Sequence, residues 1–179
     1  MGINTGYLTA ATTRDSDEVY TPAYAVKPII KHISTFFNDD SIIWCPFDEE
    51  DSNYVIELKK AGYTVIATHI NNEQDFFDYE PKQYDLIISN PPFSLKDKIL
   101  KRLNELNKPF AMLLPLPTLQ GQKRFQYLKD CQALIFDKRI NYYKNKETKE
   151  IQRGVAFASI YICKGILTND LIFEELEVE

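Results

Sequence analysis

Short apolar runs alternate with amphipathic helical segments along most of this chain of 179 residues. Residues 42–45, 84–89 and 110–114 are apolar runs of strand length, and apolar residues at helical spacing lie between them. Such alternation is typical of buried parallel strands that are joined by helices. The sequence therefore predicts an α/β fold with a doubly wound, mainly parallel sheet.

The boundaries of the expected elements follow from helix and turn signals. Thr21 can cap a helix whose first turn suits Pro22, and Gly62 suits the position just after a helix. We expect one domain over 1–179, with an N-terminal arm at 1–20 and an acidic tail at 164–179. The expected strands are 42–45, 65–67, 84–89, 110–114, 133–136 and 155–163, and the expected helices are 24–37, 54–61, 96–106 and 121–130.

The composition narrows the class of protein. The net charge is −5, no apolar run reaches the roughly 18 residues of a membrane span, and residues 1–20 do not resemble a signal peptide. Cys45, Cys131 and Cys163 are far apart and form no CxxC pair, which argues against a disulfide framework and a cysteine metal site. We expect a cytoplasmic protein without a membrane partner or a metal, either a monomer or a homodimer.

The most informative strand end is at Asn90-Pro91-Pro92-Phe93, directly after the buried run 85–89. In doubly wound sheets, ligands bind beyond the carboxyl ends of the strands. Two prolines fix the backbone and donate no hydrogen bond, so a purely structural interpretation of this segment is a rigid turn that ends the strand.

The same turn can also carry chemistry. An amino group that is conjugated to a ring is a poor nucleophile, because its lone pair is delocalised into the ring. The side-chain oxygen of Asn90 and the carbonyl of Pro91 can accept hydrogen bonds from both N–H groups and so favour the geometry that attacks an electrophile. Pro92 helps to hold these acceptors rigid, and Phe93 can stack on the ring.

Asn90-Pro91-Pro92-Phe93 resembles the catalytic signature of S-adenosylmethionine-dependent amino methyltransferases, in the form found in adenine-N6 enzymes. The chain is further similar to the small DNA methyltransferases of bacterial phages and prophages, over about 17–163. The resemblance implies a Rossmann-like methyltransferase fold whose last strand, 157–163, is antiparallel. It also implies methyl transfer from S-adenosylmethionine to the N6 amino group of adenine in DNA.

The resemblance assigns cofactor contacts to four segments. Residues 17–22 match an entry motif for the methionine end, 44–48 match the loop after the first strand, and 75–77 match an acidic-aromatic pair beside the cofactor adenine. The residues so implied are Tyr20, Thr21, Pro22, Cys45, Pro46, Phe47, Asp48, His69, Asp75, Phe76 and Asn90.

Two features depart from the family pattern. Residues 46–51 read Pro-Phe-Asp-Glu-Glu-Asp where the family has a glycine-rich loop. Four carboxylates disfavour a phosphate-bearing cofactor but are compatible with a cationic sulfonium; Glu49 and Glu50 can equally belong to a solvated acidic loop. Thr68-His69 replaces the acid that binds the ribose hydroxyls, and His69 is either a hydroxyl partner or a structural residue.

We expect the surface that binds the substrate to be basic and to lack a separate recognition domain. The predicted elements leave no room for a target-recognition domain, so we expect short or relaxed sequence specificity on double-stranded DNA, with the target base flipped out. Residues 138–153 hold six basic and two acidic groups, which is typical of a phosphate contact or of a solvated hairpin. The expected nucleic-acid contacts are Lys123, Arg124, Lys144, Lys146, Lys149 and Arg153.

Two alternatives stay open. The same signature serves methyltransferases of RNA bases and of protein glutamine, although the glutamine enzymes have a glycine-rich first loop and tyrosine in place of Phe93. A chain that lacks the glycine loop and the ribose acid can also be a catalytically inactive binding protein.

Overall fold

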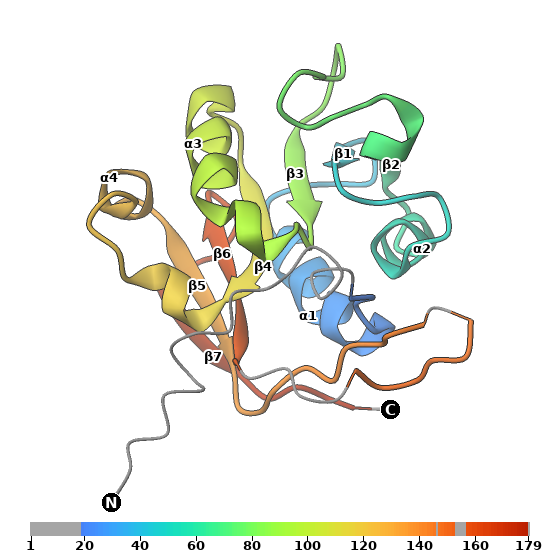
Figure 1. Cartoon of the computed structure of the whole chain (residues 1–179). Helices are drawn as coiled ribbons and strands as arrows, with labels where there is room; N and C mark the ends of the chain where they lie inside the picture. Colours follow the sequence, from blue (N-terminus) through green and yellow to red (C-terminus); the bar gives the residue numbers. More distant parts are fainter. Residues whose placement is uncertain (1–18, 146, 153–156, 179) are drawn as a thin grey trace, which may run out of the picture.

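The computed structural model describes residues 19–145, 147–152 and 157–178, and these residues build a seven-stranded sheet with helices packed against it (Figure 1). The strands are β1 Ile42–Cys45, β2 Thr64–Ala67, β3 Leu86–Ser89, β4 Phe110–Pro115, β5 Gln132–Phe136, β6 Ser159–Lys164 and β7 Leu171–Glu174. The helices are α1 Ala23–Ile33, α2 Asn53–Lys60, α3 Lys96–Leu106 and α4 Phe125–Leu128, with 3-10 turns η3 Ile70–Asn72, η4 Phe93–Leu95 and η5 Leu116–Leu119.

The strand order β2-β1-β3-β4-β6-β5-β7 confirms the prediction of a doubly wound, mainly parallel sheet. Every neighbouring pair is parallel except the two pairs that contain β6, which is antiparallel to β4 and β5. Because β2 and β4 lie on opposite sides of the β1–β3 pair, right-handed connections place α2 and α3 on opposite faces of the sheet. Helix α1 packs beside α2, and α4 packs beside α3.

The antiparallel strand was predicted to be the last, and only an acidic tail was predicted after it; this part of the prediction is wrong. Residues 171–174 form β7, which pairs in parallel with β5. Its carboxyl end is also held by side chains, because the carboxylate of Glu174 lies 2.6 Å from His32 Nε2 and 2.9 Å from Lys31 Nζ. The acidic residues that flank this short apolar run masked its strand character.

Several other boundaries differ from the prediction: the helix expected at 24–37 ends at Ile33, and the strand expected at 84–89 begins at Leu86. Of the helix expected at 121–130, only four residues form α4, and a turn precedes it. The strand expected at 155–163 begins at Ser159, and residues 153–156 lie outside the described residues. Of the expected arm at 1–20, residues 19 and 20 are described, and Tyr20 forms an antiparallel bridge with Tyr143.

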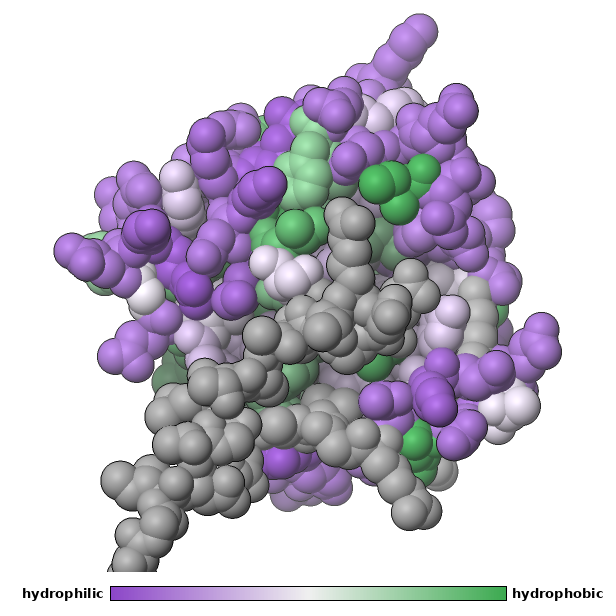
Figure 2. Space-filling model, in the orientation of Figure 1, coloured by the Kyte–Doolittle hydropathy of each residue, from purple (hydrophilic) through white to green (hydrophobic). Residues whose placement is uncertain are grey.

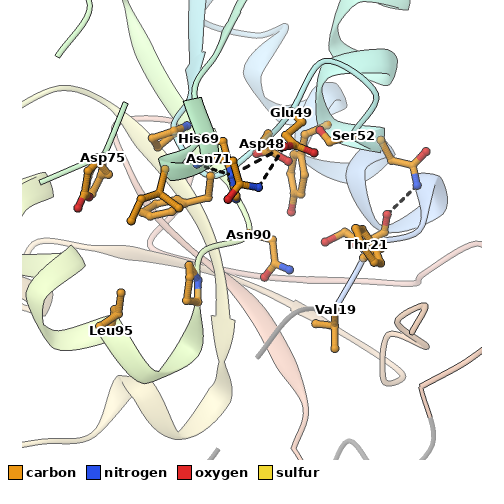
Figure 3. Close-up of a pocket in the computed structure, with 18 of the residues that line it drawn as sticks. Val19, Thr21, Asp48, Glu49, Ser52, His69, Asn71, Asp75, Asn90 and Leu95 are labelled. Carbon is orange, nitrogen blue, oxygen red and sulfur yellow. Dashed lines mark hydrogen bonds and ion pairs between the residues drawn. The ribbon is translucent and has the colours of Figure 1, made fainter. Parts of the chain in front are cut away.

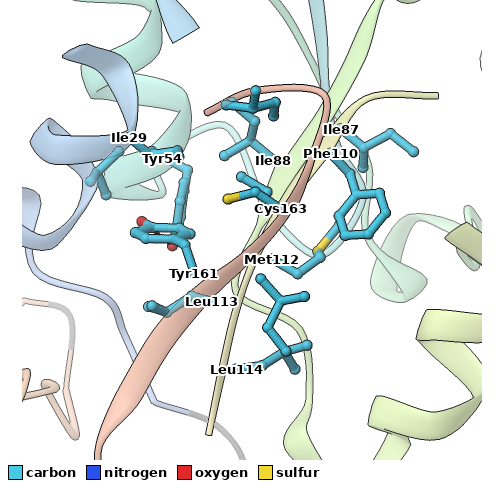
Figure 4. Packing of buried hydrophobic residues seen from close by; sticks show 14 of the residues in the cluster. Ile29, Tyr54, Ile87, Ile88, Phe110, Met112, Leu113, Leu114, Tyr161 and Cys163 are labelled. Atoms are coloured by element: carbon cyan, nitrogen blue, oxygen red, sulfur yellow. Dashed lines mark hydrogen bonds between the residues drawn. The ribbon is translucent and has the colours of Figure 1, made fainter. Parts of the chain in front are cut away.

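The core lies between the sheet and its helices and consists mainly of aliphatic side chains (Figure 4). Strands β3 and β4 are buried along their whole length, as continuous apolar runs in a parallel sheet require. Trp44, Cys45 and Cys163 are fully buried in the core, whereas Cys131 is half-buried. No helix of the described residues is long and apolar enough to cross a membrane.

A buried tyrosine pair joins the core to α1. The Tyr161 hydroxyl donates to the carbonyl of Ala25 over 2.9 Å and lies 2.8 Å from the Tyr54 hydroxyl. Burial raises the pKa of both phenols well above 10, so both remain neutral.

We expect Tyr161→Phe to lower the free energy of unfolding by about 1–3 kcal/mol, because it leaves the buried Ala25 carbonyl and the Tyr54 hydroxyl without this partner. Urea titration followed by circular dichroism measures the loss. Tyr79→Phe, at a half-buried tyrosine, is the control and should cost less than about 0.5 kcal/mol. Equal losses in the two variants would contradict the role given to the Tyr161 hydroxyl.

Candidate active site

A pocket of about 260 Å³ lies beyond the carboxyl ends of β1, β2 and β3 (Figure 3). It is where ligands bind in doubly wound sheets, next to β1, from which the strand order runs in both directions. The pocket is lined by Val19, Tyr20, Thr21, Pro46, Phe47, Asp48, Glu49, Ser52, Asn53, Tyr54, His69, Ile70, Asn71, Asp75, Phe76, Phe77, Asn90, Pro92 and Leu95.

Aromatic side chains form one wall of the pocket. The Phe76 ring lies 5.0 Å from that of Phe47 and 5.6 Å from that of Phe77, measured between centroids. The carboxylate of Asp75 accepts a hydrogen bond from the Phe77 backbone N–H over 3.0 Å, which fixes this turn. The Phe76 ring is inclined by 53° to that of Phe47 and by 66° to that of Phe77, so the wall is an apolar surface of tilted rings with a carboxylate at its edge, against which a purine ring can pack.

A carboxylate sits inside the pocket between two strand ends. Asp48 is only 8% exposed, and its side chain accepts a hydrogen bond from the hydroxyl of Ser89, the residue just before Asn90. The Ser89 hydroxyl therefore ties the loop after β1 to the loop after β3. A buried carboxylate favours a positively charged ligand beside it.

The loop after β1 takes its shape without glycine. None of residues 46–51 has a positive φ angle, so this backbone needs no left-handed conformation. The Asp48 N–H donates to the Thr68 carbonyl over 3.2 Å, and the Ser52 hydroxyl then caps α2 by accepting from the Val55 N–H. The departure from the family's glycine-rich loop thus leaves a well-formed strand-to-helix connection.

A polar rim at the end of β2 combines His69, Asn71 and Glu49. The Nδ1 atom of His69 accepts from the Asn71 backbone N–H over 3.2 Å and so caps η3, which leaves the Nε2 atom as a donor in the neutral ring. The Asn71 side chain donates to the Glu49 carboxylate over 3.3 Å. The rim therefore presents a carboxylate and an imidazole N–H, the groups that bind vicinal hydroxyls.

Two polar atoms of the pocket are buried without a hydrogen-bond partner among the described residues. They are the side-chain oxygen of Asn90, at the end of β3, and the hydroxyl of Thr21, just before α1. Thr21 is only 7% exposed, and its carbonyl accepts from the Asn53 side chain over 2.7 Å, so its position is fixed. Because an orphaned buried polar atom is costly, both atoms indicate a site that a polar ligand completes.

The structure brings together most of the residues assigned to the cofactor from the sequence. Nine of the eleven line the pocket, whereas Pro22 and Cys45 are buried behind it. Of the catalytic motif, Asn90 and Pro92 line the pocket and Pro91 is buried outside its lining. The Phe93 ring packs edge-on against Tyr142 and Phe157, at centroid distances of 6.3 and 5.3 Å.

Sequence reasoning missed several lining residues, in particular Ser52, Asn53 and Tyr54 on α2 and Asn71 in η3. Their distance from any motif explains the omission, since only the tertiary fold places the start of α2 beside the end of β3. A cap signal at Ser52 was available, because serine precedes the apolar face of α2.

The predicted nucleic-acid contacts are dispersed. Lys144 and Lys149 are exposed in the basic hairpin, and Lys123 is exposed beside α4, whereas Lys146 and Arg153 lie outside the described residues. Arg124 is engaged within the protein, with its Nε atom 2.7 Å from the Asp97 carboxylate.

The hairpin of residues 138–152 is attached to the pocket through its own backbone. Tyr143 forms antiparallel bridges with both Tyr20 and Ile151, and Tyr20 lines the pocket. Tyr142 is buried and donates to the Ser159 hydroxyl over 2.8 Å, which anchors the hairpin at the sheet. Among the described residues, no group of His, Cys, Asp and Glu side chains is arranged to hold a metal ion.

No protein-family model and no curated protein matches this sequence. Among solved structures, the chain is similar to a release factor-specific protein-(glutamine-N5) methyltransferase from Alicyclobacillus acidocaldarius, with 11% sequence identity and a TM-score of 0.41. The similarity covers 92% of this chain and 99% of the other.

Proposed function

We propose that the protein is an S-adenosylmethionine-dependent methyltransferase that acts on the N6 amino group of adenine in DNA, in the manner of phage-encoded enzymes with little sequence specificity. The observation that carries the proposal is the Asn90 side-chain oxygen, which is buried at the pocket without a partner among the described residues. It follows a buried strand and precedes two prolines, as an acceptor for a planar NH₂ group requires.

The residues of the pocket fit the cofactor. Its adenine would lie against the Phe47 and Phe76 rings, and its ribose hydroxyls would meet Glu49 and His69. The buried Asp48 carboxylate offers the negative charge that a sulfonium ion favours, and the Thr21 hydroxyl gains a partner from the methionine end. When bound, S-adenosylmethionine supplies an electrophilic methyl group.

The protein's part in the reaction is to position the amino group. The Asn90 oxygen would accept a hydrogen bond from the amino group and so help to direct the nitrogen lone pair at the methyl carbon. The amino nitrogen would receive the methyl group from S-adenosylmethionine, which would leave as a neutral thioether. The amine is then cationic and loses a proton to water, so no strong general base is needed.

The proposal is tested by calorimetric titration with S-adenosylmethionine, followed by incubation with unmethylated duplex DNA, RNA and a bacterial protein extract. Mass analysis of the products should show N6-methyladenine in DNA. Methylated adenine in RNA alone, or methylglutamine in protein alone, would refute DNA as the substrate and identify RNA or protein in its place. Absence of cofactor binding would refute an enzymatic role and favour a binding protein of the same fold.

We expect charge reversal of the basic hairpin, Lys144→Glu with Lys149→Glu, to weaken DNA binding about tenfold and to reduce its salt dependence. Fluorescence anisotropy over a series of salt concentrations measures both quantities. The matched control is Lys82→Glu with Lys129→Glu, which makes the same charge change at two exposed lysines outside the hairpin. An effect no larger than that of the control would show that the hairpin does not contact DNA.

A further inference from the structure

A second hollow, of about 390 Å³, lies between α3 and α4, outside the pocket described above. Lys98 and Lys101 line it from α3, and Lys123, Gln126 and Tyr127 line it from the α4 side. Figure 1 places these helices at the upper left, opposite the hairpin at the lower right, and Figure 2 shows mainly hydrophilic side chains over them. We refer to this hollow as the α3–α4 groove.

The charges of the α3–α4 groove do not cancel. Its one lining carboxylate, Asp97, is held by Arg124, with 2.7 Å between Oδ1 and Nε. Arg124 also donates to the carbonyls of Thr118 and Gln120, both over 3.4 Å. This network fixes α4 against α3 and uses up one positive and one negative charge, which leaves three lysines facing the groove.

The three lysines are available to a ligand from solvent. All three are exposed, and the ion pair of Lys101 with Glu105, one turn along α3, is long at 3.7 Å. Lys98 and Lys101 are three residues apart on one face of α3, and Lys123 faces them across the groove. Ammonium groups spread along a channel suit an extended polyanion better than one small anion, which would need them to converge.

The groove lies close to the candidate active site along the chain. Leu95 lines the pocket, and α3 begins at the next residue, so Lys98 stands within one helical turn of the site. The segment that leads into α4 also presents apolar side chains to solvent: Phe125 is 68% exposed and Leu119 is 41% exposed. Apolar groups beside a basic channel are what bases and sugars contact when a backbone is held nearby.

We infer that the α3–α4 groove binds the phosphate backbone of the nucleic-acid substrate through Lys98, Lys101 and Lys123. The inference rests on the proposed function, since it supplies the surface that holds the strand whose base enters the pocket. Arg124 acts as a positioning residue here, because its ion pair with Asp97 keeps the two walls of the groove together.

The test compares two triple variants that carry the same charge change. Lys98→Gln, Lys101→Gln and Lys123→Gln removes the groove cations, and Lys59→Gln, Lys60→Gln and Lys82→Gln removes three cations outside the groove, on α2 and before β3. Fluorescence anisotropy with a 20-base-pair duplex, as DNA and as RNA, gives the affinity and its salt dependence. Thermal melting and calorimetric titration with S-adenosylmethionine show whether each variant keeps its fold and its pocket.

We expect the groove triple to weaken binding of one duplex or both at least tenfold, and to reduce the slope of log K against log salt by about 2 to 3. The control triple should change the affinity less than threefold. A groove triple that binds like the control, or a wild-type protein that binds neither duplex, would overturn the inference. Binding that is lost in the groove triple while wild-type protein transfers no methyl group would support the groove and refute the proposed function.

Discussion

Asn90→Ala should reduce methyl transfer at least a thousandfold while cofactor affinity changes less than threefold. The side-chain oxygen of Asn90 is the acceptor that the pocket leaves without a partner among the described residues. Alanine removes this acceptor, and with it the alignment of the amino lone pair, which is worth several kcal/mol when a reacting group is held in place. Single-turnover transfer from labelled cofactor to duplex DNA measures the rate, and calorimetry measures the affinity.

Asn90→Asp is the matched variant, because it keeps a side-chain oxygen in the same place while it replaces the amide NH₂ by a second oxygen and adds a negative charge. It should retain more transfer than Asn90→Ala at every cofactor concentration. If alanine transfers as fast as wild type, Asn90 has no part in the reaction and the turn is a strand terminator alone. If both variants lose cofactor binding, the residue holds the cofactor and not the amino group.

Asp48→Asn should weaken binding of S-adenosylmethionine about 10- to 100-fold. The substitution keeps the shape of the side chain and an oxygen that can accept from Ser89, but it removes a buried negative charge. An opposite charge within about 5 Å of a sulfonium contributes on the order of 1–3 kcal/mol to binding at a partly exposed site. Since a tenfold change in affinity equals about 1.4 kcal/mol, this energy corresponds to the expected loss. Titration calorimetry at one salt concentration measures the difference.

The demethylated product, S-adenosylhomocysteine, separates the possible roles of this carboxylate. The product lacks the sulfonium charge but keeps the ammonium group, so we expect its affinity to fall less than that of the substrate. An equal fall would place the Asp48 carboxylate against the ammonium. Glu50→Gln, at an exposed acid of the same loop that is paired with Lys59, is the control and should change neither affinity more than threefold.

Much of the sheet could be predicted because buried parallel strands are continuous apolar runs. Strand β1 has the predicted bounds, and α3 matches the predicted helix because its apolar residues keep helical spacing up to Leu106. Strand β7 was missed because only four residues pair there, at the edge of the sheet, where exposed Phe173 and the neighbouring acids resemble a tail. Its strand character depends on a tertiary neighbour, β5, and not on its own pattern.

The candidate site was predictable where one segment carries the chemistry, and not where separate segments meet. The turn at Asn90 has its own signature, but the role of Arg124 depends on Asp97, which lies 27 residues away. The place of Arg124 after the loop that follows the strand 110–114 put it on the expected nucleic-acid face, and in the structure its side chain joins two helices. Lys98 and Lys101 were overlooked because lysines on the solvent face of a helix are ordinary, and only the position of α4 makes a groove of them.

The bridge between Tyr20 and Tyr143 couples the order of the pocket to the order of the basic hairpin. One partner lines the pocket and the other belongs to the basic hairpin, and their backbones exchange two hydrogen bonds of 2.9 Å. A ligand that steadies either segment therefore lowers the entropy that the other must lose on binding. If a bound cofactor raises the affinity for nucleic acid by some factor, bound nucleic acid must raise the affinity for the cofactor by the same factor, because linkage is reciprocal.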